Sequence, residues 1–117
     1  MRISENKLNK SFKNQIIKTF AQTLLDFKSM DEIHGFLTNF FNDSELETFA
    51  KRLYIAYWLN NGRSYENIKT NIKVSSATIA TIEKLSKKPG FSLGVKKMEA
   101  EEWANVWAEK IQKFIKK

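Results

Sequence analysis

The residues of this sequence that could do chemistry are four small or cationic side chains on one predicted helix. When the apolar residues of segment 75–85 face inward, Ser76, Thr78, Thr81 and Lys84 are left facing outward. Hydroxyl groups can donate to and accept from the edges of bases, and small side chains let a helix sit deep in a groove of a duplex. This pattern favours nucleic-acid binding, and an ordinary helical hairpin is the alternative interpretation.

The residue types that catalysis and metal binding need are scarce. The chain has no cysteine, and its only histidine, His34, lies off the apolar stripe of its predicted helix, so we expect it at the surface. A zinc site or a nucleophile–base pair needs more than one such group, and no glycine-rich phosphate loop is present. We therefore expect no enzyme activity, no metal and no cofactor.

The positive charge is concentrated around the candidate face. The formal net charge of the chain is +7, and residues 64–97 hold seven Lys or Arg against two Asp or Glu. A basic patch beside a helix that could enter a groove is typical of proteins that bind a DNA duplex. A solvated charged face is the simpler interpretation, so the charge supports the motif without standing alone.

Two short predicted helices position the candidate face. Ser64 is expected to cap the first helix, where Tyr65, Ile68 and Ile72 share one side, and Ser75 is expected to cap the second. The inward residues of the second helix are Ile79, Ile82 and Leu85. Two amphipathic helices of this length, joined by a tight turn, predict a helix-turn-helix over residues 64–85.

Further helices are predicted on both sides of this unit. Broad apolar stripes indicate helices over 11–27, 33–41 and 44–60, with capping pairs Ser29–Glu32 and Ser44–Glu47. Gly62 is expected to end the third in a left-handed conformation. Residues 86–97, with the only proline, predict a basic loop, and residues 98–116 predict a last helix with Trp103 and Trp107 on its apolar side.

The expected architecture is a single all-α domain over residues 1–117. Residues 1–10 are polar and basic and predict a flexible arm, and residues 11–62 predict helices that support the helix-turn-helix. The absence of cysteine fits a reducing cytoplasm. No apolar run approaches the roughly 20 residues of a membrane span. These features predict a soluble, cytoplasmic protein.

Residues 42–85 resemble the Trp repressor superfamily, and more closely its YerC/YecD-like branch. The similarity lies in SELETFAKRLYIAYWLNNGRSYENIKTNIKVSSATIATI, above all in Ala-x-Arg-Leu around Arg52, in the Gly62-x-Ser64-Tyr65 junction and in residues 75–79. The resemblance implies a six-helix Trp-repressor-like fold that forms an intertwined homodimer through the N-terminal helices, residues 11–62. Such a dimer would cover the broad stripes on the first two helices.

The resemblance also implies roles for individual residues in binding double-stranded DNA. Lys69 would contact phosphate, and Ser75, at the start of the recognition helix, would also belong to the DNA-binding residues. Ser76, Ala77 and Thr78 would face base edges, and Thr81 and Lys84 would flank them. Ala77 and the Thr78 methyl group suit thymine methyl groups.

The sequence departs from the family at the turn and at the corepressor site. Lys73 stands in the turn where members usually have glycine, and Ala80 and Thr81 stand where the branch usually has Ser-Arg. Of the corepressor residues only Arg52 is retained. Ile82 replaces the glycine that leaves room for an indole, and it would fill that space. Arg52 would bind a ligand only if a corepressor pocket persists.

These observations lead to two hypotheses. The first is a dimeric, sequence-specific DNA-binding transcriptional regulator, repressor-like, that does not respond to tryptophan. The alternative is a helical dimerisation or protein-interaction module whose degenerate helix-turn-helix no longer binds DNA. The charge over residues 64–97 favours the first, whereas Lys73 and the missing arginine favour the second.

Overall fold

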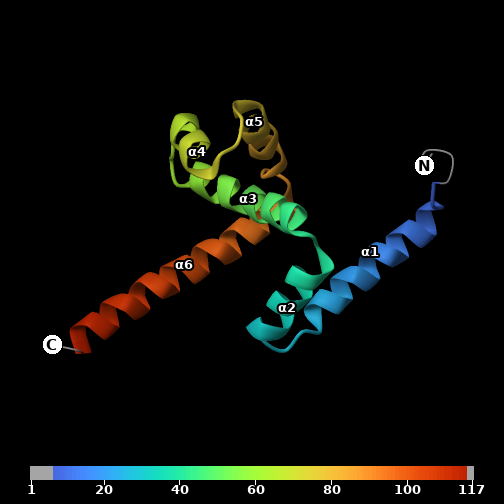
Figure 1. Cartoon of the computed structure of the whole chain (residues 1–117), viewed down its shortest axis with the longest axis horizontal. Helices are drawn as coiled ribbons and strands as arrows, with labels where there is room; N and C mark the ends of the chain where they lie inside the picture. The colour runs from blue at the N-terminus through green and yellow to red at the C-terminus, as the bar shows by residue number, and fades with distance from the viewer. Residues whose placement is uncertain (1–6, 116–117) are drawn as a thin grey trace. The chain divides into compact units, whose positions relative to one another are not determined.

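A computed structural model of the chain describes residues 7–115 and contains six helices in that range (Figure 1). They are α1 (Lys10–Leu25), α2 (Met30–Phe40), α3 (Asp43–Asn60), α4 (Tyr65–Ile72), α5 (Ser76–Leu85) and α6 (Pro89–Ile115). No strand occurs within residues 7–115, so the predicted all-α fold is confirmed. The chain divides between Leu46 and Glu47 into two compact units. The single domain over residues 1–117 stays a prediction.

Side-chain caps decide where the first two helices begin. The Asn9 side-chain oxygen accepts the Phe12 N–H at 2.8 Å, so α1 starts at Lys10. Part of the predicted arm, residues 1–10, therefore belongs to the start of α1, and residues 1–6 of that arm lie outside the described range. Ser29 caps α2 as predicted, by accepting the Glu32 N–H at 3.2 Å.

Aromatic side chains hold α1 and α2 together. The ring of Phe20 lies 6.4 Å from that of Phe36 and 5.7 Å from that of Phe40, and Phe36 stacks on Phe40 at 4.9 Å. Yet neither helix contains a buried residue. Towards the start of α1, Phe12 and Ile17 are 47% and 56% exposed. The broad stripe that the sequence predicts on α1 is thus largely uncovered by α2.

The third helix begins earlier than the capping pair Ser44–Glu47 predicts. The Asn42 side-chain oxygen accepts the Glu45 N–H at 2.8 Å, and the Glu45 carboxylate accepts the Asn42 N–H at 2.9 Å. This reciprocal pair makes Asp43 the first residue of α3, because Asn is as good an N-cap as Ser and its acidic partner stands three residues later.

The core of the second unit lies between α3, α4, α5 and the beginning of α6. Its buried residues are Ile55, Ala56, Ile68, Ile79, Ile82 and Val95. The apolar stripe predicted over residues 44–60 includes Phe49 and Tyr54, which are 47% and 43% exposed, but it does not include Ile55, which is fully buried. The face of α3 that packs was therefore only partly predicted.

The predicted loop over residues 86–97 is wrong, because α6 begins at Pro89. Proline suits the first position of a helix, where its missing N–H has no partner to lose. Val95 is then buried, and a Cβ at Gly94 would lie 3.9 Å from Leu53 Cδ1, so α6 runs close to α3 here. Asn60 donates to the Glu99 carboxylate at 3.1 Å. Within residues 7–115 no helix has the length and apolar character needed to cross a membrane.

Candidate nucleic-acid interface

Helices α4 and α5, joined by residues 73–75, form the predicted helix-turn-helix. Ser64 caps α4 by accepting the Asn67 N–H, and Ser75 caps α5 by accepting the Thr78 N–H, both at 3.1 Å. Both caps are as predicted. Ile68 and Ile79 are fully buried between the helices and α3, which sets which side of α5 remains outside.

The turn depends on one residue in a left-handed conformation. Lys73 has φ 65° and ψ 54°, and its N–H donates to the Lys69 carbonyl oxygen at 3.0 Å. Residues with a Cβ adopt this conformation at a cost, which is why glycine is common at such positions. Lys73 therefore adopts the left-handed conformation that this turn requires, although it carries a Cβ.

The structure places the predicted DNA-contact residues around the outer side of the helix-turn-helix. On α5 and its cap these residues are exposed: Ser75, Ser76, Ala77, Thr78, Thr81 and Lys84. Lys69 projects from α4 and is half-buried. The structure thus brings the candidates together on one unit, as the sequence predicts, although their contacts with DNA stay a prediction.

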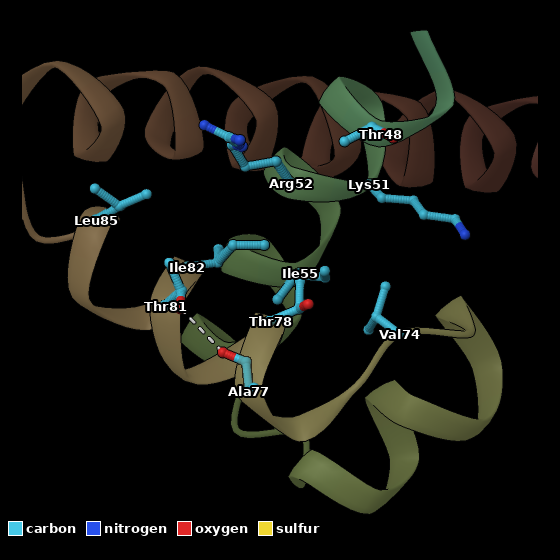
Figure 2. Close-up of a pocket in the computed structure, with 10 residues that line it drawn as sticks. All are labelled: Thr48, Lys51, Arg52, Ile55, Val74, Ala77, Thr78, Thr81, Ile82 and Leu85. Carbon is cyan, nitrogen blue, oxygen red and sulfur yellow. Dashed lines mark hydrogen bonds between the residues drawn. The ribbon is translucent and has the colours of Figure 1, made fainter. Parts of the chain in front are cut away.

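The hydroxyl groups on α5 are not equally available. The Ser75 hydroxyl accepts from the Thr78 N–H and donates to the Thr78 Oγ1 at 3.0 Å. The Thr81 hydroxyl donates to the Ala77 carbonyl oxygen at 3.0 Å (Figure 2). Among the described residues, Ser76 has no hydrogen-bond partner for its side chain. Ser76 and Thr78 therefore keep a proton that they can donate, whereas Ser75 is a structural cap.

A side-chain hydrogen bond ties the two helices together. The Tyr65 hydroxyl on α4 donates to the Glu83 carboxylate on α5. This hydrogen bond, together with burial and the negative charge of Glu83, raises the pKa of Tyr65 above its usual value. The sequence analysis assigned Glu83 no role, because its partner lies 18 residues away.

Arg63 holds the corner between α3 and α4. Its guanidinium lies 3.8 Å from the centre of the Trp58 ring and donates to the Asn67 side-chain oxygen at 3.0 Å. Gly62 beside it has φ 82°, and the Arg63 N–H donates to the Trp58 carbonyl oxygen at 3.1 Å. This confirms the left-handed stop predicted at Gly62 and gives Arg63 a structural role that the sequence analysis missed.

A hollow of about 440 Å³ lies between α3 and α5 (Figure 2). Its lining residues are Thr48, Lys51, Arg52, Ile55, Val74, Ala77, Thr78, Thr81, Ile82 and Leu85. Ile82 is 5% exposed and forms part of the wall of this hollow, and its effect on the binding of an indole stays a prediction. Arg52 lines the hollow, and ligand binding by Arg52 stays a prediction.

The two cations of the hollow, Lys51 and Arg52, are adjacent residues of α3. Lys51 forms an ion pair with Glu47 at 3.6 Å. Arg52 is exposed, and its side chain points away from that of Lys51 in Figure 2. The opposite wall is apolar or hydroxylated, through Ala77 and Thr81 of α5. The hollow therefore has cationic side chains on the α3 side and apolar or hydroxylated side chains on the α5 side.

Comparison with known proteins adds a family to this geometry. Residues 15–93 match the family described as Trp repressor protein. The chain is also similar to YerC of Bacillus subtilis (strain 168), an uncharacterized protein, with 29% identity over 62 residues. That similarity spans 53% of this chain and 60% of the relative. No solved structure matches the chain.

Proposed function

Because the chain belongs to the Trp repressor protein family, we propose that it is a dimeric, sequence-specific DNA-binding regulator of transcription. The observation that supports this function best is the preformed α5. Its inner side is fixed by Ile79 and Ile82, and its outer side presents small side chains around Ser76 and Thr78. A helix held in this way can enter the major groove without rearrangement of the protein.

Each candidate residue has a distinct role in this proposal. Lys69 contacts phosphate, which contributes affinity on any sequence. Ser76 and Thr78 donate to base edges, and Ala77 and the Thr78 methyl group contact thymine methyl groups. Thr81 and Lys84 flank the reading surface. In the dimer, the two recognition helices would enter successive major grooves about 34–36 Å apart.

Two measurements, made one after the other, test this function. The affinity for a random duplex should fall linearly as the logarithm of salt concentration rises, because phosphate contacts release counterions. Selection from a pool of random sites should then enrich a two-fold related sequence whose halves are one helical turn apart. Binding without any enrichment would leave a non-specific DNA-binding protein and contradict the proposed sequence specificity.

A helical interaction module that no longer binds DNA is the second candidate function. The observation in its favour is the chemistry of α5, whose exposed residues include no Arg, Asn or Gln for bidentate base recognition. The occupied hydroxyls of Ser75 and Thr81 reduce the available donors further. If the protein binds no duplex even at low salt while remaining folded, this second function replaces the first.

We further propose that tryptophan does not regulate the protein. In the hollow between α3 and α5, the four-carbon side chain of Ile82 stands where the related repressors have glycine, and Thr81 offers no positive charge. Calorimetry with millimolar L-tryptophan should give no saturable heat and no gain in thermal stability. An isotherm with one site per subunit would contradict this, and Arg52→Ala should then abolish it.

A further inference from the structure

The C-terminal half of α6 exposes a continuous apolar face (orange to red in Figure 1). Its exposed residues are Trp103 (65%), Val106 (48%), Trp107 (47%), Ile111 (54%), Phe114 (82%) and Ile115 (73%). They recur at spacings of three and four, so they lie on one side of the helix. We refer to these six residues as the tail face.

The tail face is too apolar to be an ordinary solvated surface. The rings of Trp103 and Trp107 contact each other at 5.7 Å, and Lys110 lies 5.5 Å from the centre of the Trp107 ring. Contiguous exposed apolar patches with polar edges mark interaction sites. The family match ends at residue 93, before the first residue of the tail face.

The charges beside the tail face change sign along the helix. Glu101 and Glu102 stand at its beginning, and Lys110 and Lys113 stand towards its end, with Glu109 between them. Glu102 and Lys113 are eleven residues apart, which is close to three helical turns, so both lie along the same edge. Two such helices in antiparallel orientation would place the acidic end of each beside the basic end of the other.

We propose that the tail face pairs with the same face of a second copy of the chain, in antiparallel orientation. Glu102 of each copy then faces Lys113 of the other, twice by symmetry, and the two-fold axis passes between residues 107 and 108. The two Trp107 rings meet at this axis. The pairing specifies one contact of the homodimer, and therefore rests on the proposal that the chain self-associates.

A basic helix is the rival occupant of the tail face. In this chain α1 would be such a helix, because it has Lys10, Lys13 and Lys18 and no acidic residue. It would suit Glu102 but would oppose Lys113, whereas self-pairing satisfies both charges. The two occupants therefore predict opposite effects of changing Lys113.

Charge reversal at the two residues separates these occupants. In sedimentation at low ionic strength, Glu102→Lys and Lys113→Glu should each raise the dimer dissociation constant about tenfold, since two symmetric pairs become repulsive. The double variant should restore the parent value. Gln112→Glu, about half a turn away from Trp103, is the matched control and should have little effect.

Each other result overturns the pairing. If Lys113→Glu tightens the dimer and the double variant fails to restore it, the occupant is a basic helix. If the protein remains a dimer and no variant changes its dissociation constant, the dimer contact does not involve the tail face, while the proposed dimer stands. A monomer at every concentration tested would remove the dimer and the pairing together, although DNA binding could still be measured.

Disulfide trapping tests the orientation, because the chain has no cysteine of its own. Under mild oxidation Trp107→Cys should form a covalent dimer with itself. Trp103→Cys should not, because antiparallel pairing separates the two copies of residue 103 by about 14 Å along the axis. A disulfide requires Cα atoms within about 7 Å. Equal trapping of both variants would indicate parallel pairing and contradict the proposal.

Discussion

Lys73 shows at the scale of one residue how the turn of the helix-turn-helix is made. Its φ of 65° lies in the left-handed region, and it is the only non-glycine residue of the described range with a positive φ. Such a conformation costs a residue with a Cβ about 1–2 kcal/mol. The left-handed conformation of Lys73 therefore lowers the free energy of unfolding of the protein.

Replacing Lys73 by glycine should raise the free energy of unfolding by about 1 kcal/mol, because glycine adopts this conformation without the steric penalty. Urea denaturation measures the change. Asn71→Gly, at an exposed position inside α4, is the matched control and should lower stability by up to about 1 kcal/mol. If both glycines destabilise the protein alike, the left-handed turn is absent in solution.

The hydrogen bond from Tyr65 to Glu83 leads to a prediction about pH. Because the pKa of Tyr65 is raised in the folded protein, its contribution to stability is fully present below the pKa of the unfolded chain, near 10. It is lost as pH rises from there through the folded pKa. Tyr65→Phe should reduce stability at pH 8 and should remove this part of the alkaline decline.

The difference in thermal stability between the parent and Tyr65→Phe should therefore shrink between pH 9 and pH 11. Measuring the difference cancels the titration of the lysines, which both proteins share. A difference that stays constant across this range would show that the Tyr65 hydroxyl does not donate to Glu83. A constant difference would also mean that this hydrogen bond does not hold α4 against α5.

At the scale of elements, α5 exposes its outer side because α3, α4 and the beginning of α6 cover the other side. Lys69 stands on α4 and Thr78 on α5, so the two helices should contribute differently to DNA binding. A phosphate contact adds affinity on every sequence, whereas a base contact adds it on one. The two substitutions below separate these contributions.

Lys69→Ala should weaken binding to all sequences alike and reduce the slope of log affinity against log salt by about 0.9. Thr78→Ala should leave this slope unchanged and reduce discrimination at one base pair by about 1–3 kcal/mol. Titrations of matched and mismatched duplexes at several salt concentrations measure both. Lys28→Ala, in the first unit, is the control; if it matches Lys69→Ala, the phosphate contact is misassigned.

At the scale of the whole molecule, exposed apolar residues on α1, α2 and α6 predict that folding and association are linked. Phe12 on α1, Phe40 on α2 and Trp103 on α6 are between 47% and 65% exposed. Exposed apolar side chains of this kind are what a subunit interface buries.

Light scattering at micromolar concentration should therefore give the mass of a dimer, and the unfolding midpoint should rise with protein concentration by mass action. On dilution, the helix content and the fraction of dimer should fall together. A stable, folded monomer with a concentration-independent midpoint would contradict an obligate dimer. The charge variants of α6 then show which part of the interface has failed.

The features that the sequence determined by itself are those made by residues close together in the chain. The caps at Ser64 and Ser75, the inward side of α5 and the stop at Gly62 were all predictable, because helix periodicity and capping involve residues three or four apart. The same local signals misled at the third helix, since Asn42 rather than Ser44 caps it.

Only the tertiary structure decided the features that join distant residues. The burial of Ile55 and the start of α6 at Pro89 depend on how α3, α5 and α6 meet, and the hollow beside Arg52 is the space that this packing leaves. The hydrogen bond from Tyr65 to Glu83 spans 18 residues. Periodicity assigns a residue to a side of its own helix, but packing between helices determines what that side contacts.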